Sequence, residues 1–256
     1  MNYITRRLAE IKQNGYQIDL GNLIDESFTN YKKIALLAGL ALIIVILSLL
    51  ILTIFGMSYF IDFENFNEES MVMDFSQFTA TEILAYIGGV SLLGMLFAPF
   101  TAGLIKLAHD VETKEEVSFS TIFECYKASY LKDLLLSSLL ISVITGSIAV
   151  AFQILRLDFV GTLLSYFIGF LLSMTIPLII FGGLSAFQAI SNSILVVSKQ
   201  PIWIFLALLI AAIASCVGLI AFCLGIFFTL PYLYSMYYVI YKNSVGFEEQ
   251  ETFNNL

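Results

Sequence analysis

Long stretches without charge alternate along this chain with short segments that carry Lys, Asp and Glu. The longest uncharged stretch runs from Gln200 to Tyr241, 42 residues in all. As a single helix it would be about 60 Å long, roughly twice the ~30 Å hydrocarbon core of a bilayer. The pattern therefore predicts two membrane crossings joined by a turn.

Four further apolar stretches are each long enough to cross a membrane as a helix. The predicted spans are Ile34–Tyr59, Ile83–His109, Leu134–Leu155, Phe159–Phe181, Ile202–Leu219 and Phe222–Tyr241. We therefore predict an all-α fold, a polytopic bundle of six transmembrane helices. One domain, 1–256, is expected to comprise an N-terminal segment 1–33, the spans within 34–242 and a tail 243–256.

The distribution of basic residues orients these spans. Eleven of the twelve Lys and Arg residues lie in three places on one side of the predicted membrane. Five precede span one, four lie at or within the connection between spans two and three, and Lys199 and Lys242 stand before span five and after span six. Only Arg156 falls elsewhere. The connection between spans one and two carries acids without Lys or Arg: Asp62, Glu64, Glu68, Glu69, Asp74 and Glu82. Since Lys and Arg concentrate on the cytoplasmic side, both termini are predicted to be cytoplasmic.

Composition supports a membrane location and excludes some partners. The chain is 59% hydrophobic and 12% charged, whereas a soluble domain carries about 25% charged residues. Its formal net charge of −8 argues against nucleic acid as a partner, because binding a phosphate backbone requires a basic face.

Three segments that precede spans one, three and five resemble one another. In each, apolar residues recur at helical spacing and a Lys follows at the membrane edge. These apolar positions are Leu20, Leu23, Ile24, Phe28 and Tyr31; Phe119, Ile122, Phe123, Tyr126 and Tyr130; and Leu184, Phe187, Ile190, Ile194 and Val197. We predict three amphipathic helices in the cytoplasmic interface, each followed by a hairpin, which makes a threefold internal repeat.

Capping signatures and prolines accompany this repeat. The expected caps pair Asn22 with Asp25, Thr121 with Glu124 and Ser185 with Gln188. The second helix of each hairpin holds one proline: Pro99, Pro177 and Pro231. These prolines are expected to kink their helices and release carbonyls that serve as hinges or ligands, although membrane helices also tolerate proline for packing alone.

Small residues recur at four-residue spacing in five spans. They are Gly94, Ala98 and Ala102; Ser138, Ser142 and Gly146; Gly161, Ser165, Gly169 and Ser173; Ala207, Ala211 and Ser215; and Ala221, Gly225 and Thr229. Close helix packing is the favoured interpretation, because lipid supplies no hydrophobic drive between helices. The alternative is a polar pathway, for which a cavity lined by Ser142, Ser165 and Thr229 would be the structural sign.

The sequence offers little chemistry. No ionisable residue lies at mid-depth in any predicted span, which weakens proton-coupled transport. The single histidine, His109, excludes a multi-histidine metal site, and its neighbours Asp110 and Glu112 are interpreted as a solvated helix end. Cys125, Cys216 and Cys223 show no metal spacing. We therefore predict no catalytic, cofactor-binding or metal-binding residues, no cofactor and no enzyme activity.

The acidic connection leaves one alternative open. Its acids are interleaved with Phe60, Phe63, Phe66, Phe75 and Phe78. Asp62, Glu64 and Glu68 are of the type that holds a hard cation, but the EF-hand spacing and glycine are missing. A short amphipathic segment on the outer leaflet is the favoured interpretation.

The third repeat unit carries a family resemblance. Its string GGLSAFQAISNSILVVSKQPIWIF, followed by Gly218, Gly225, Pro231 and Tyr238, resembles a broad, largely uncharacterised set of bacterial six-helix integral membrane proteins. These are related to the membrane domain fused to some glycerophosphodiester phosphodiesterases. The resemblance implies the same six-helix fold and a bacterial cytoplasmic (inner) membrane. It supplies no catalytic residues, and a soluble phosphodiesterase domain is missing from this chain.

Two functions follow as hypotheses. The first is a non-catalytic membrane protein that binds a protein partner, or further copies of itself, or organises membrane lipid. The second is a carrier or flippase-like protein for a neutral or lipid-like substrate, with the proline-kinked helices as its moving parts.

Overall fold

The computed structural model describes residues 3–60, 78–114, 116–220 and 225–248. Within these ranges the chain is helical and contains no strand, which confirms the all-α prediction. The elements are α1 (Tyr3–Asn14), α2 (Leu20–Phe60), α3 (Ala80–Thr113), η4 (Phe119–Tyr126), α4 (Leu131–Ile154), α5 (Asp158–Leu171), α6 (Thr175–Ile180), α7 (Ala186–Lys199), α8 (Pro201–Cys216), η5 (Val217–Ile220), α9 (Gly225–Thr229) and α10 (Pro231–Ser244).

Five helical segments are long and apolar enough to cross a membrane. They are Leu20–Thr53, Ala80–Thr113, Leu131–Ile154, Asp158–Ile180 and Pro201–Ile220. Each corresponds to one predicted span, so a multi-pass membrane protein is confirmed at this level. The sixth predicted span is divided between the short α9 and α10, and its beginning lies outside the described residues.

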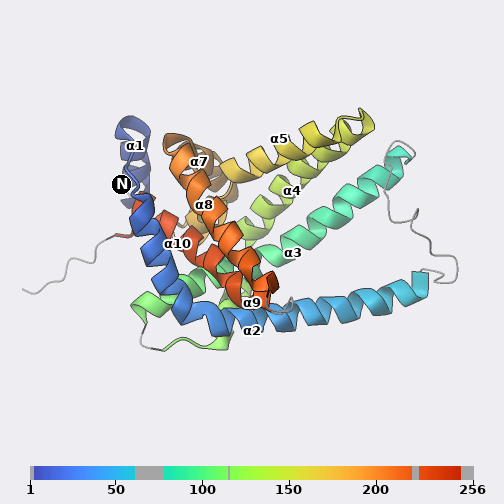
Figure 1. Ribbon diagram of the computed structural model, residues 1–256. Coiled ribbons are helices and arrows are strands. Elements are labelled where there is room, and N and C mark those ends of the chain that lie inside the picture. The colour runs from blue at the N-terminus through green and yellow to red at the C-terminus, as the bar shows by residue number, and fades with distance from the viewer. Residues whose placement is uncertain (1–2, 61–77, 115, 221–224, 249–256) are drawn as a thin grey trace, which may run out of the picture.

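The three expected interfacial helices take three different forms. The first is the beginning of α2, which continues without interruption into span one because no Gly or Pro separates Tyr31 from Ile34; Figure 1 shows that α2 bends part-way along. The second is the 3₁₀ helix η4. The third is the separate α-helix α7. The threefold repeat therefore stays a prediction.

Of the three expected caps, only one forms as predicted. Ser185 and Gln188 form the predicted capping box at the start of α7. Thr121 makes no cap, because it is buried inside η4. At the start of α2 the Asp19 carboxylate, not Asn22, is the acceptor, and the Asn22 N–H donates to it at 2.9 Å. The sequence prediction missed a further box at the start of α3, where Thr79 pairs with Glu82. The rest of the acidic connection lies outside the described residues, and with it both the predicted amphipathic segment and the alternative cation ligands Asp62, Glu64 and Glu68.

The prolines do not act alike. α3 continues through Pro99. The fourth predicted span is interrupted between α5 and α6, just before Pro177. The sixth predicted span is interrupted between α9 and α10, and Pro231 is the first residue of α10. An internal proline removes one helical hydrogen bond and clashes with the preceding turn, and an interruption relieves both costs.

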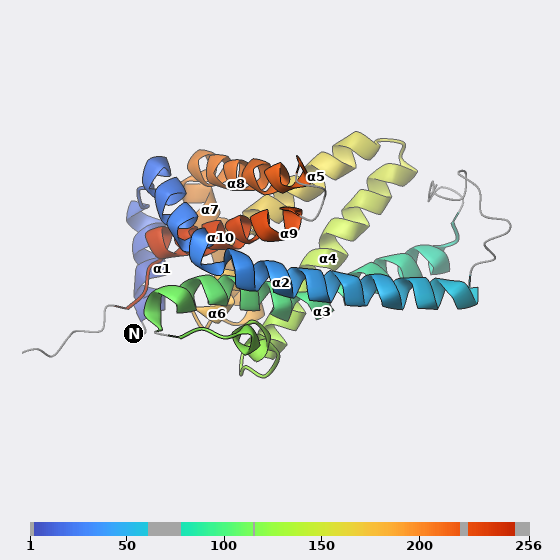
Figure 2. The ribbon, with the colours of Figure 1, turned by 60° about the horizontal axis from the view of Figure 1, so that its bottom comes forward.

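The buried core lies toward one end of the bundle, which we call the lysine end because Lys106, Lys199 and Lys242 lie there. From this end α2, α3 and the α4–α5 pair spread apart like a fan (Figures 1 and 2). Beyond Leu42, no residue of α2 whose burial is described is buried. Apolar side chains on the outer parts of these helices are exposed, as expected of surfaces that face lipid.

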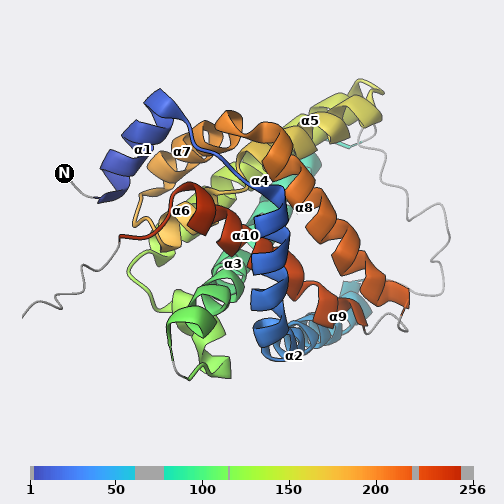
Figure 3. The same cartoon turned by 60° about the vertical axis from the view of Figure 1, so that its left-hand side comes forward.

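Helix α10 occupies the centre of the lysine end, between α2, α3 and α8 (Figure 3). Nine of its residues are buried, including Tyr238 and Tyr241. Helix α1 lies in the N-terminal segment 1–33, for whose first part the sequence analysis predicted no helix, and it packs on α7. The Tyr16 hydroxyl after α1 donates to the Val196 carbonyl at 2.8 Å, and Lys199 donates to the Lys12 carbonyl at 2.8 Å.

Small residues lie where helices approach most closely. A side chain added at Gly103 would place its Cβ 1.8 Å from the Ile122 carbonyl oxygen, so α3 and η4 meet backbone to backbone there. At the α3–α4 contact the Ser138 hydroxyl donates to the Gly94 carbonyl at 2.9 Å. These contacts agree with the packing interpretation of the small-residue pattern.

Candidate functional site

A polar network at the lysine end joins three helices. One Glu112 oxygen at the end of α3 accepts from the Asn30 amide of α2 at 2.8 Å, and the other accepts from Tyr238 at 2.9 Å and Lys242 at 3.1 Å. Asn30 is 1% exposed, donates also to the Ala108 carbonyl at 2.6 Å and accepts from the Ser235 hydroxyl at 2.5 Å. Every polar atom of the Asn30 side chain is therefore paired. We use the term structural lock for such a buried polar side chain whose hydrogen bonds hold its surroundings in place.

Asp110 forms a second lock on α3. Its side chain is only 2% exposed, so the prediction of a solvated helix end is wrong for this residue. Lys114 donates to Asp110 at 2.7 Å, the Lys106 ammonium lies 3.9 Å from it and His109 Nδ1 lies 3.1 Å from it. The prediction failed because Lys106, one turn earlier, and Lys114, one turn later, fold over the carboxylate.

His109 lies among aromatic rings. Its ring centroid is 5.2 Å from that of Phe181, 5.8 Å from that of Tyr238 and 4.9 Å from that of Phe247. Across the described part of the chain, no three His, Cys, Asp or Glu side chains are grouped so as to hold a metal ion. The Glu112 network and the rings around His109 bind helices to one another, whereas the contacts of Asp110 stay within α3 and Lys114 directly after it. The spaces in which a ligand fits lie elsewhere.

A cavity of about 240 Å³ lies between α3, α4, α10 and the interruption between α5 and α6. We call it the hydroxyl cavity, because most of the residues that line it carry a hydroxyl group. These are Thr101, Ser137, Ser138, Ser142, Ser173 and Thr175, together with Tyr237. Carbon atoms make up most of the remaining wall, with Ile105 and Ile141 among them.

Ser193 of α7 holds the α5–α6 interruption in place. Its buried hydroxyl donates to the Leu171 carbonyl at 2.8 Å and accepts from the Met174 N–H at 3.1 Å, so it bridges both sides of the interruption. Because Pro177 has no N–H, the Ser173 carbonyl also lacks its usual helical donor four residues on. The interruption is thus fixed by α7 while it presents polar groups to the hydroxyl cavity.

Two hydroxyls at this interruption have no partner. The oxygens of Ser173 and Thr175 are inaccessible and make no hydrogen bond, and Thr175 is 1% exposed as a residue. By contrast, the neighbouring Ser137 and Ser138 hydroxyls donate to carbonyls, at 3.0 Å to Leu134 and 2.9 Å to Gly94.

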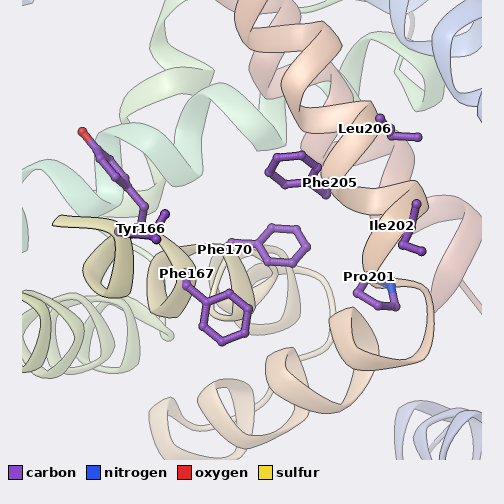
Figure 4. A pocket seen from close by; sticks show the side chains of 8 residues that line it. Tyr166, Phe167, Phe170, Pro201, Ile202, Phe205 and Leu206 are labelled. Atoms are coloured by element: carbon purple, nitrogen blue, oxygen red, sulfur yellow. The ribbon is translucent and has the colours of Figure 1, made fainter. Parts of the chain in front are cut away.

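A second space, the aromatic groove, lies between α5 and α8 and has a volume of about 390 Å³. Phe170 of α5 and Phe205 of α8 face one another across it, with their ring centroids 5.8 Å apart (Figure 4). Pro201 and Ile202 line it where α8 begins, and Tyr166, Phe167, Leu163 and Leu206 complete it. Apart from the Tyr166 hydroxyl, every lining side chain is a hydrocarbon.

The structure separates the three residues expected to share a polar cavity. Ser142 lines the hydroxyl cavity. Ser165 instead donates to the Thr145 carbonyl at 3.2 Å, which joins α5 to α4, and Thr229 donates to the Ser215 carbonyl, which joins α9 to α8. Sequence reasoning did not single out Thr175, because no local pattern marks its hydroxyl as buried and unpaired.

Comparison with known proteins identifies no relative. No family model matches the chain, no curated protein matches it, and no solved structure matches its fold. The two spaces and their surroundings are therefore the features of the chain that indicate its function.

Proposed function

We propose that this chain is a non-catalytic integral membrane protein that binds and organises lipid, with the aromatic groove as its site for one acyl chain. We place it in a bacterial cytoplasmic membrane with six spans in three repeated hairpins, and with both termini in the cytoplasm. The return of α10 to the lysine end supports the sixth crossing, since α8 leaves that end and α10 comes back to it. The excess of Lys at that end supports its cytoplasmic orientation.

The observation that carries the proposal is the composition and position of the aromatic groove. It lies between two segments of membrane-crossing length, and its volume falls in the usual range for ligand sites. Its lining presents hydrocarbon and aromatic surface, which matches an acyl chain and leaves a polar substrate without partners. Because lipid tails are already in an apolar medium, selectivity must come from packing against shaped walls, and rigid rings such as Phe170 and Phe205 supply such walls.

The end of the groove nearest the lysine end suits a lipid headgroup. Pro201 lines this end, and Lys199 stands two residues before it. The Lys199 ammonium uses one donor on the Lys12 carbonyl, which leaves two donors for an anionic phosphate. Basic residues at the cytoplasmic surface attract anionic lipids in the same way.

The test is native mass spectrometry of the protein released from its own membrane, with two matched variants. Leu163→Trp fills the groove, whereas Leu209→Trp adds the same side chain at an exposed position of α8 outside it. We expect one phospholipid to stay bound to the wild type and to Leu209→Trp and to be lost from Leu163→Trp. Equal retention by the two variants would refute the assignment, and a second polypeptide at fixed stoichiometry would favour partner binding.

The second candidate function is a carrier or flippase-like protein for a neutral or lipid-like substrate. The interrupted span at the hydroxyl cavity favours it, since carriers commonly build substrate sites at interrupted helices. Substrate-dependent uptake into vesicles that contain only this protein would support it. Retention of one lipid without any transport would favour the first function.

A further inference from the structure

The two walls of the aromatic groove touch where Phe170 of α5 meets Phe205 of α8. Their ring centroids are 5.8 Å apart at an interplanar angle of 88°, which is a direct edge-to-face contact. An acyl chain that runs along the groove passes this contact only if the two rings part. A small shift of one wall is enough to part them, so the way in which α8 is held decides access to the groove.

The end of α8 away from the lysine end is fastened to α9. The Ser215 hydroxyl donates to the Thr229 carbonyl at 3.3 Å, and the Thr229 hydroxyl donates to the Ser215 carbonyl. The groove lies along the opposite end of α8, where Pro201 to Leu206 line it directly after α7. The position of this wall therefore depends on how the junction of α7 and α8 is held.

That junction is a break in the helix at Gln200. Its backbone angles, φ −139° and ψ 53°, are not helical, and a residue before proline is disfavoured in the helical conformation. Since Pro201 has no N–H, the Val197 carbonyl accepts from the Gln200 N–H at 3.3 Å instead, which leaves the Val196 carbonyl without its helical donor. A single non-helical residue between two helices is a place where a hinge motion occurs.

Three hydrogen bonds tie this junction to the connection between α1 and α2 (Figure 3). The Tyr16 hydroxyl donates to the Val196 carbonyl at 2.8 Å and so replaces the missing helical donor. In return, the Gln200 amide donates to the Tyr16 carbonyl at 2.6 Å, and Lys199 donates to the Lys12 carbonyl at 2.8 Å. We call these three bonds the latch.

We propose that Tyr16 and Gln200 are positioning residues of the aromatic groove, because the latch fixes the α8 wall against α5 although neither residue lines the groove. When the latch opens, the first turns of α8 tilt about the fastened end at Ser215, the Phe170–Phe205 contact parts, and lipid enters or leaves. Neutral hydrogen bonds suit a reversible device, since water replaces them at little net cost. The lipid part of this inference rests on the proposed function of the groove, whereas the motion of α8 does not.

The test measures distances between spin labels by double electron–electron resonance, on the full-length protein in lipid nanodiscs with its native cysteines replaced by alanine. One label is attached at Thr162→Cys of α5 and the other at Trp203→Cys of α8, both exposed positions that do not line the groove. A second pair joins Thr162→Cys to Ile213→Cys, near the fastened end. A tilt of about 10° about Ser215 moves Trp203 by about 3 Å, because the twelve residues between them span ~18 Å.

The variants are Tyr16→Phe, Gln200→Met and the two together. Tyr3→Phe is the matched control, because its hydroxyl also bonds a distant carbonyl, that of Val245 at 3.3 Å, but lies away from the latch. We expect the double variant to show a broader and longer Thr162–Trp203 distance with an unchanged Thr162–Ile213 distance. Exchange of bound phospholipid for isotope-labelled phospholipid, followed by native mass spectrometry, should be roughly 2- to 10-fold faster in each single variant, as expected for the loss of one neutral hydrogen bond. Tyr3→Phe should match the wild type in every measurement.

An unchanged Thr162–Trp203 distance in a double variant with wild-type helical content would overturn the inference. Equal lengthening of both distances, or the same change in Tyr3→Phe, would overturn it too, because the loosening would then not be specific to the latch. If the double variant does not fold, the single variants decide, since each keeps two of the three latch bonds. A lengthened distance in a protein that retains no phospholipid would support the latch and refute the proposed function of the groove.

Discussion

Removing the Asn30 side chain tests whether the polar network holds the lysine end together. In Asn30→Ala, Glu112 loses a charged-acceptor hydrogen bond, and the Ala108 carbonyl and the Ser235 hydroxyl each lose a neutral one. Charged hydrogen bonds contribute about 1.5–3 kcal/mol and neutral ones about 0.5–1.5 kcal/mol. Because all three are lost at a site that is 1% exposed, we expect the free energy of unfolding to fall by about 3–5 kcal/mol.

Asn192→Ala is the matched control on α7. The Asn192 amide makes a single hydrogen bond to the Gln188 carbonyl of its own helix, on an exposed face. Both substitutions gain helix propensity, up to about 0.7 kcal/mol, so their difference isolates the network. We expect Asn192→Ala to lie within about 0.5 kcal/mol of the wild type.

The assay is reversible unfolding in mixed micelles, followed by circular dichroism as the SDS fraction rises. A difference between the two alanine variants below about 1 kcal/mol would refute the assignment of a structural lock. A double-mutant cycle between Asn30→Ala and Ser235→Ala should show coupling of about 0.5–3 kcal/mol, because the two side chains are hydrogen-bonded to one another.

Two further predictions concern close contacts and burial. Gly103→Ala should lower the unfolding free energy by about 1–3 kcal/mol or more, because its Cβ would overlap the Ile122 carbonyl. In Gly88→Ala the new Cβ would have nothing within 4 Å, so this control should leave the unfolding free energy unchanged or raise it. Equal stability of the two variants in the same assay would contradict the contact. Cys125 is buried, and burial raises the pKa of its thiol, so at pH 7.5 N-ethylmaleimide should label it far more slowly in the folded protein than after unfolding. Mass spectrometry of the labelled peptide gives both rates, and equal rates before and after unfolding would contradict the burial of Cys125.

The sequence was most informative about the spans and least informative about how helices meet. A long apolar stretch predicts a helix because a chain in lipid must satisfy its backbone internally, and α3, α4 and α8 agree with this rule. The capping box at Ser185 was equally readable, since both of its partners lie within four residues.

Features that depend on distant residues were not readable in this way. Nothing in the local sequence distinguishes Pro99, which α3 accommodates, from Pro177, where the helix is interrupted and Ser193 of another helix bridges the gap. The same limit applies to the sites. That the Thr175 hydroxyl is buried without a partner beside the hydroxyl cavity could be recognised only from the fold.

The lock between Asn30 and Ser235 also has a consequence for how the chain is made. The two residues are 205 positions apart, an interval that takes a ribosome about 10–40 s at 5–20 residues per second. Throughout that interval the Asn30 amide lacks the hydroxyl of α10 that completes its pairing. Assembly of this end of the bundle must therefore wait for the final hairpin, and until then the early helices depend on water or on the insertion machinery to cover their polar groups.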